Sequence, residues 1–187
     1  MPSNDDDPAV SGAAVTPYGL NHVVLNVRDM EESHQFWTGI VGLRQVGELH
    51  PSARLPNPPK MRFYSGDRGG KTHHHDLALV ENPTLLRIAS VPLAIHHIAI
   101  ALPTRDAWLR QITFLRSRGV AFTRRINHGM TRSLYIRDPN GYEVELLYEL
   151  PRQLWEGDID AALNWLEPVV DGDVVGDFGR EEPNQHE

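Results

Sequence analysis

Hydrophobic and polar residues alternate in two similar stretches of the chain. LNHVVLNV at 20–27 and IHHIAIAL at 95–102 each have the period of a half-buried strand. Capped helical patterns follow them, beginning at Asp29 in the first case and near Thr104 in the second. Each helix is expected to bury one apolar face, formed by Met30, Trp37 and Ile40 in the first and by Trp108, Ile112 and Leu115 in the second.

More strand-like segments follow each helix. They are MRFYSGD at 61–67 and HHDLALVE at 74–81, then SLYIRD at 133–138 and YEVELLYE at 142–149. The last pair flanks a DPNG turn, and the sum is β-α-β-β-β, repeated. We therefore predict an α+β fold of two tandem βαβββ modules, 18–94 and 95–150, with the helices outside. The two modules are expected to form a half-open, barrel-like sheet around a common centre.

The two ends of the chain have a different character. Residues 1–17 lack periodicity and are interpreted as a disordered tail. Residues 151–187 are predicted to hold a helix within 156–168, followed by an acidic tail. The spacing of Ile159, Leu163 and Leu166 favours packing of this helix against the body.

The amino-acid composition argues against several classes of function. The 187 residues carry a net charge of −7, which argues against nucleic acid as a partner because phosphate binding needs a basic face. The chain has no cysteine, so any metal must bind to His, Asp or Glu. No stretch is apolar enough to span a membrane and the N-terminus is acidic, so a cytoplasmic location is expected.

The repeat draws attention to three residues with metal-binding side chains. His22 and His97 occupy the same place in the first strand of each module, and Glu145 interrupts the alternation of the last strand. A lone Glu in a strand is usually solvated, but two facing modules would bring all three side chains to a common centre. Two imidazoles and one carboxylate form a facial triad that leaves about three positions open on an octahedral ferrous ion.

The duplicated pattern over residues 18–150 resembles the vicinal oxygen chelate superfamily, which includes glyoxalase I, fosfomycin-resistance enzymes, bleomycin-binding proteins and type I extradiol dioxygenases. HHDLALVE, IHHIAI and NHGMTRSLYIRDPNGYEVELLYE are most similar to one-domain extradiol dioxygenases. The resemblance implies Fe(II)-dependent ring cleavage of a catechol-type aromatic diol with dioxygen. Nitrogen and oxygen ligands alone do not choose between Fe(II) and Mn(II).

The resemblance also implies a role for individual residues. The implied metal ligands are His22, His97 and Glu145, and the implied catalytic residues are His75, His128 and Tyr135. His75 would act as the acid–base residue, while Tyr135 and His128 would contact the substrate oxygens. Within the HHH run at 73–75, we expect His75 to point inward and His73 outward.

Two other functions stay open at this point. A glyoxalase- or fosfomycin-resistance-like lyase, isomerase or transferase would use the metal as a Lewis acid. A glyoxalase-like site would need a fourth protein ligand, for which Asp76 is the candidate. A metal-free small-molecule binding protein would leave the histidines without a common role. Pairing into a homo-oligomer is compatible with the sequence but not indicated by any particular patch.

Overall fold

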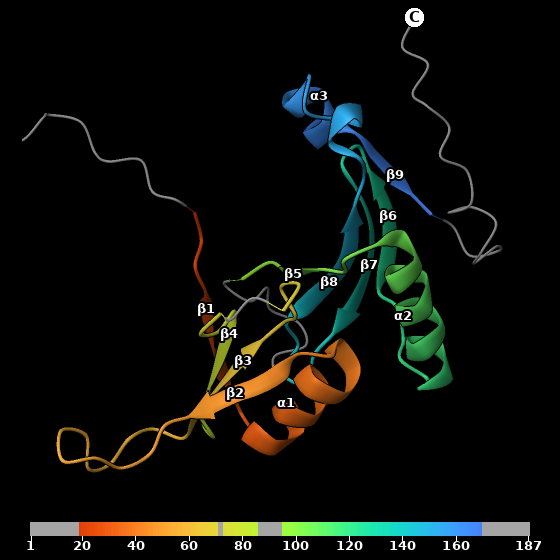
Figure 1. Ribbon diagram of the computed structural model, residues 1–187. Coiled ribbons are helices and arrows are strands. Elements are labelled where there is room, and N and C mark those ends of the chain that lie inside the picture. The colour runs from red at the N-terminus through yellow and green to blue at the C-terminus, as the bar shows by residue number, and fades with distance from the viewer. Residues whose placement is uncertain (1–18, 71–72, 86–94, 170–187) are drawn as a thin grey trace, which may run out of the picture.

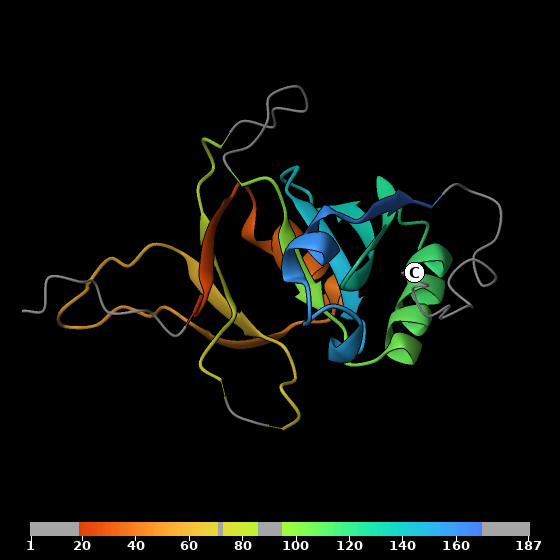
Figure 2. The same ribbon diagram turned by 90° about the horizontal axis from the view of Figure 1, so that it is seen from above.

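The computed structural model describes residues 19–70, 73–85 and 95–169, so both predicted tails, 1–17 and the stretch from 171 to 187, lie outside the described residues. The predicted α+β fold of two βαβββ modules is confirmed. Within these described ranges the strands form two sheets, of four and five strands, and these sheets do not join into a closed barrel. Figures 1 and 2 show the two sheets as separate layers of one molecule.

In the part of the chain that the structure describes, the first module contains four strands and one helix. Its elements are β1 (Val23–Val27), α1 (Met30–Phe36), a π-helical continuation η1 (Trp37–Val41), β2 (Arg44–Glu48), β3 (Met61–Ser65) and β4 (Leu77–Glu81). The strand order is β1-β4-β3-β2, with β1 and β4 parallel. The helix follows β1 and packs on one face of this sheet, which leaves the opposite face open.

The second module repeats this plan and adds a strand. Its elements are β5 (Ile98–Ala101), α2 (Arg105–Ser117), β6 (Arg124–His128), β7 (Thr131–Arg137) and β8 (Glu143–Glu149), and the added strand is β9 (Leu166–Pro168). The order is β5-β8-β7-β6-β9, with β5 parallel to β8. The two parallel pairings, β1 with β4 and β5 with β8, are therefore equivalent.

Local sequence signals explain where the helices begin. The Asp29 carboxylate accepts hydrogen bonds from the backbone N–H groups of Glu31 and Glu32, and the Thr104 hydroxyl accepts one from the N–H of Ala107. The predicted helical faces are buried, except that Ile40 is half-buried, and they join the inner strand residues in one hydrophobic core shared by both modules. Within the described residues, no helix combines the length and the apolar character needed to cross a bilayer.

The DPNG turn fastens the second module to the first. Asn140 is buried, its Oδ1 accepts a hydrogen bond of 2.8 Å from the N–H of Arg28, and its Nδ2 donates one of 3.0 Å to Ser33 Oγ. The Tyr142 hydroxyl also donates to the carbonyl of Asn26, at 3.2 Å. These polar contacts add to the shared hydrophobic core in holding the two sheets together.

The C-terminal segment differs from its prediction. A helix forms as α3 (Ile159–Asn164), but Ile159 is 53% exposed, Leu163 65% and Leu166 58%, so these residues do not pack against the body. Instead Ala162 is the buried contact, because it lies against Gly129, where a Cβ would come within 2.6 Å of the Ala162 carbonyl oxygen. Leu166 belongs to β9, where hydrogen bonding to the edge of β6 replaces helical structure.

Candidate functional site

Each sheet has one face that does not pack against its helix, and we call this its open face. In the second sheet the open face of β5 carries His97 and Ala99, and strand pairing places Ala99 opposite Glu145 and Glu145 opposite Tyr135. His22 and His97 each stand one residue before the strand that opens their module, β1 and β5. The two histidines therefore occupy equivalent backbone positions in the two modules, as predicted.

Glu145 is the most unusual side chain of this face. It lies in the middle of β8 and is only 5% exposed, and its Oε2 lies 3.1 Å from Nε2 of His97. A buried carboxylate is costly unless it has a charged or hydrogen-bonding partner. The usual interpretation of a strand Glu as a solvated residue is therefore wrong here, and Glu145 and His97 form a ready pair of nitrogen and oxygen donors.

Tyr135 and His128 lie next to this pair. The Tyr135 hydroxyl is 3.2 Å from Nε2 of His128, and the rings of Tyr135 and His97 meet edge to face. Burial, reinforced by the negative charge of Glu145, raises the pKa of Tyr135. Burial also lowers the pKa of His128, although the charge of Glu145 opposes this shift. At neutral pH the pair consists of a protonated phenol, which can donate a hydrogen bond, and a neutral imidazole.

Arg124 is a neighbour of the site that the sequence did not indicate. Its guanidinium lies over the Tyr135 ring, 4.2 Å from the centroid, and forms an ion pair with Glu143. Arg124 stands opposite Tyr135 in the β6–β7 register. Cross-strand partners share a face of a sheet, so the pairing of Arg124 with Tyr135 could in principle have indicated this contact. The sequence did not reveal β6 as a separate strand, and its register depends on the turn at 129–130.

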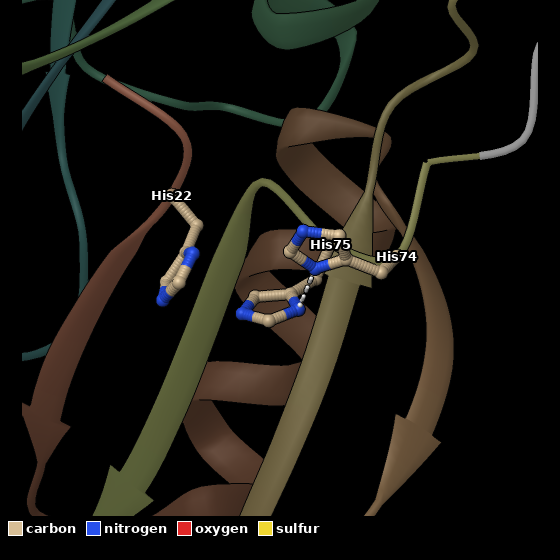
Figure 3. Close-up of side chains that lie close together, drawn as sticks. All are labelled: His22, His74 and His75. Carbon is tan, nitrogen blue, oxygen red and sulfur yellow. Dashed lines mark hydrogen bonds between the residues drawn. The ribbon is translucent and has the colours of Figure 1, made fainter. Parts of the chain in front are cut away.

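A second group of side chains gathers on the open face of the first sheet. The rings of His22 and His75 have centroids 4.3 Å apart, and Nδ1 of His74 lies 2.7 Å from Nδ1 of His75 (Figure 3). Burial, followed by the proximity of His22, His74 and His73, lowers the pKa of His75. The expected inward orientation of His75 agrees with its half-buried position against Phe63, where the ring centroids are 5.0 Å apart.

The expectation that His73 points outward is wrong. Its side chain is half-buried and its Nδ1 lies 3.4 Å from Oδ1 of Asp76. Asp76 accepts hydrogen bonds from Ser65 Oγ, the N–H of Gly66 and the guanidinium of Arg68. Burial by itself would raise the pKa of Asp76, but these hydrogen bonds outweigh it and the pKa is lowered. The Asp76 carboxylate thus stabilises the loop before β4 through these hydrogen bonds.

The internal repeat identifies the counterpart of Glu145. Val23 pairs with Leu77 as Ile98 pairs with Val144, so the next residues of β4 and β8, Ala78 and Glu145, are equivalent. The first module therefore has a methyl group where the second has a carboxylate. The two modules therefore cannot form a symmetric metal site with one carboxylate from each of these equivalent positions.

The structure thus brings the predicted site residues together in two groups. His97, Glu145, Tyr135 and His128 form one group, and His22 and His75 belong to the other. The complete ligand set of His22, His97 and Glu145 stays a prediction. Its donors do suit a divalent ion, because a buried carboxylate already faces an imidazole nitrogen and the third ligand stands at the equivalent position of the other module.

The chain belongs to the glyoxalase/bleomycin resistance protein/dioxygenase superfamily, which it matches over residues 19–146. This family and the two-sheet architecture agree with the vicinal oxygen chelate fold expected from the repeat. A glyoxalase/bleomycin resistance protein/dioxygenase domain from a Frankia species has the same fold, with a TM-score of 0.57 at 17% identity, covering 72% of this chain and 100% of that one.

Its curated relatives include both oxidative and non-oxidative enzymes. A catechol-2,3-dioxygenase of Bacillus subtilis is 25% identical over 158 residues, which are 84% of this chain and 50% of that protein. An iron-dependent extradiol dioxygenase of Rhodococcus jostii is 30% identical over 173 residues, covering 77% and 52%. A lactoylglutathione lyase of Pseudomonas putida is 24% identical over 162 residues, covering 76% and 92%. The chain spans about half the length of the two dioxygenases.

Proposed function

We propose that this protein is an Fe(II)-dependent extradiol dioxygenase that opens the ring of a catechol-type aromatic diol. The observation that carries the proposal is the buried Glu145 carboxylate, 3.1 Å from the His97 imidazole and paired across the sheet with Tyr135. His22, His97 and Glu145 would hold the ion. When bound, the iron supplies Lewis acidity toward the catechol hydroxyls and a one-electron path between the ring and dioxygen.

The residues around the proposed iron centre would handle protons and charge. His75 has a lowered pKa, so its imidazole is neutral at pH 7 and can accept a catechol proton. With Nδ1 turned toward His74, the proton would be taken at Nε2. Tyr135 has a raised pKa and so keeps its phenol proton, which it can donate to negative charge that develops on a substrate oxygen. His128 would hold the Tyr135 hydroxyl in position.

The main alternative is a non-oxidative enzyme like the lactoylglutathione lyase relative. Two observations argue against a glyoxalase-like site with four protein ligands. The counterpart of Glu145 is Ala78, which has no ligand atom, and the carboxylate of Asp76 is occupied by Ser65, Gly66 and Arg68. These two observations do not argue against a three-ligand site of the fosfomycin-resistance kind. Such an enzyme would consume no dioxygen, which distinguishes it from a dioxygenase.

The test is dioxygen uptake by protein loaded with Fe(II) under nitrogen and then mixed with air-saturated diols. Catechol and 2,3-dihydroxybiphenyl cover a small and a large ring substituent, and each ring-opened product is yellow. We expect one dioxygen consumed per diol. Bound iron without uptake for any diol would contradict the oxygenase assignment and favour Lewis-acid chemistry. Failure to bind a divalent metal would favour a metal-free binding protein.

Glu145→Gln provides the matched variant, because it keeps the shape of the side chain and removes the negative charge. Iron content and uptake should both fall at least about tenfold, as a ligand is lost. Glu149→Gln is the control, since Glu149 lies on the same strand and is exposed. Full iron content in Glu145→Gln would exclude Glu145 as a ligand.

A further inference from the structure

One histidine of the HHH run, His74, has no part in the proposed reaction, yet it belongs to a compact group. His22, His74 and His75 each offer a ring nitrogen, and these three atoms lie within 4.8 Å of one another (Figure 3). We propose that His22, His74 and His75 form a second metal site, selective for a borderline divalent ion such as Zn²⁺. It uses no residue of the second module.

Backbone pairing explains why these side chains meet. β1 and β4 run parallel, with Val23 opposite Leu77, so the residues that precede the two strands also lie side by side. The N–H of Val23 donates a hydrogen bond of 3.1 Å to the carbonyl of Asp76, which extends the pairing beyond the ends of the strands. His22 and the His74–His75 pair are therefore held by the sheet and not by chance contact of two loops.

The three ligand atoms lie within 4.8 Å of one another, so the rings must move before they can surround a tetrahedral ion. Zinc binds imidazole nitrogens at about 2.0–2.1 Å, so two such ligands on one tetrahedral ion stand roughly 3.3 Å apart. Nδ1 of His74 and Nδ1 of His75 are now 2.7 Å apart and share a proton in a hydrogen bond. His74 is exposed, so its ring can rotate outward by the few tenths of an ångström required. His22 is exposed as well, so its ring can turn toward the other two.

The donor chemistry determines which ions are suitable. Three imidazoles without a carboxylate suit Zn²⁺, Ni²⁺ or Cu²⁺, whereas Mg²⁺, Ca²⁺ and Mn²⁺ prefer oxygen ligands. The nearby Asp76 does not supply an oxygen, because Ser65, Gly66 and Arg68 hold its carboxylate. The fourth position on the ion is then left to water.

The site shares His22 with the proposed iron centre and also uses the proposed acid–base residue His75. One His22 imidazole nitrogen cannot serve both ions in their separate positions, so zinc should inhibit the dioxygenase by competing with iron. This consequence rests on the proposed function. Binding of zinc to the three histidines does not, because it depends on the first module alone.

Zinc binding is tested by equilibrium dialysis of the full chain carrying Glu145→Gln, in which the proposed iron centre is disabled. We expect one Zn²⁺ per chain. Adding His74→Ala should weaken the affinity for Zn²⁺ at least about tenfold, since even loss of an outer partner of a ligand costs about 10–100-fold. His50→Ala is the control, because His50 is an exposed histidine outside the group. Co²⁺ in place of Zn²⁺ adds a visible absorption spectrum that reports tetrahedral coordination.

The outcomes separate the two proposals. Equal Zn²⁺ affinity with and without His74, or an affinity lost equally in the His50 variant, would overturn the tri-histidine site. His74→Gln repeats the test with a polar side chain, and circular dichroism confirms that each variant folds. If wild-type protein consumes no dioxygen but zinc binding still depends on His74, the proposed function fails and the second metal site stands.

Discussion

Replacing Asn140 by Ala should weaken the attachment of the second module to the first and lower the free energy of unfolding. Asn140 is buried, and its side chain makes two hydrogen bonds across the module boundary, from the Arg28 N–H and to Ser33 Oγ. A buried polar group left without its partner costs about 1–3 kcal/mol. Ser33 is fully buried, whereas Arg28 is half-buried and can take water as a new partner. We therefore expect the free energy of unfolding to fall by about 2–4 kcal/mol.

Urea denaturation followed by circular dichroism measures this loss. Asn164→Ala is the matched control, because Asn164 is exposed and its side chain donates to the Asp160 carbonyl one turn earlier in α3. It should change the free energy of unfolding by less than about 0.5 kcal/mol. Combining Asn140→Ala with Ser33→Ala should cost less than the sum of the single changes, because the two side chains share one bond.

An unchanged free energy of unfolding in Asn140→Ala would refute the idea that this turn helps to hold the modules together. The same substitution bears on the site. The predicted ligands His22 and Glu145 stand on different modules, so a looser boundary should also lower the affinity for iron. Intact iron affinity despite the expected loss of stability would show that the ligands find one another without this turn.

Two further predictions concern the proposed chemistry. Tyr135→Phe should retain bound iron but lower kcat for dioxygen uptake about 10²–10³-fold, as removal of one positioned hydrogen-bond donor does elsewhere; unchanged kcat would show that the phenol only packs in the sheet. The lowered pKa of His75 keeps its imidazole neutral further into acid, so kcat/KM should hold as pH falls and decline only below the usual imidazole value of about 6.5. His75→Gln should abolish this acid limb, and a limb that persists would have to come from another group.

The helices and most strands could be predicted because their signals are local. The caps at Asp29 and Thr104 bond to N–H groups two or three residues away, and the buried helical faces follow from spacing alone. The equivalence of His22 and His97 was likewise visible from the repeat. Prediction was wrong where a partner outside the segment decided the outcome: Leu163 is exposed because Ala162 fits against Gly129.

The sequence by itself determined the repeated unit, the helix ends and the residue types available for a metal. Only the tertiary structure decided which of these residues meet. Strand register makes Ala78 the counterpart of Glu145, buries Glu145 against His97, and sets His22 beside His74 and His75. The physical reason is that register and burial arise from pairing between strands distant in the chain, whereas a local pattern fixes only the face on which a side chain lies.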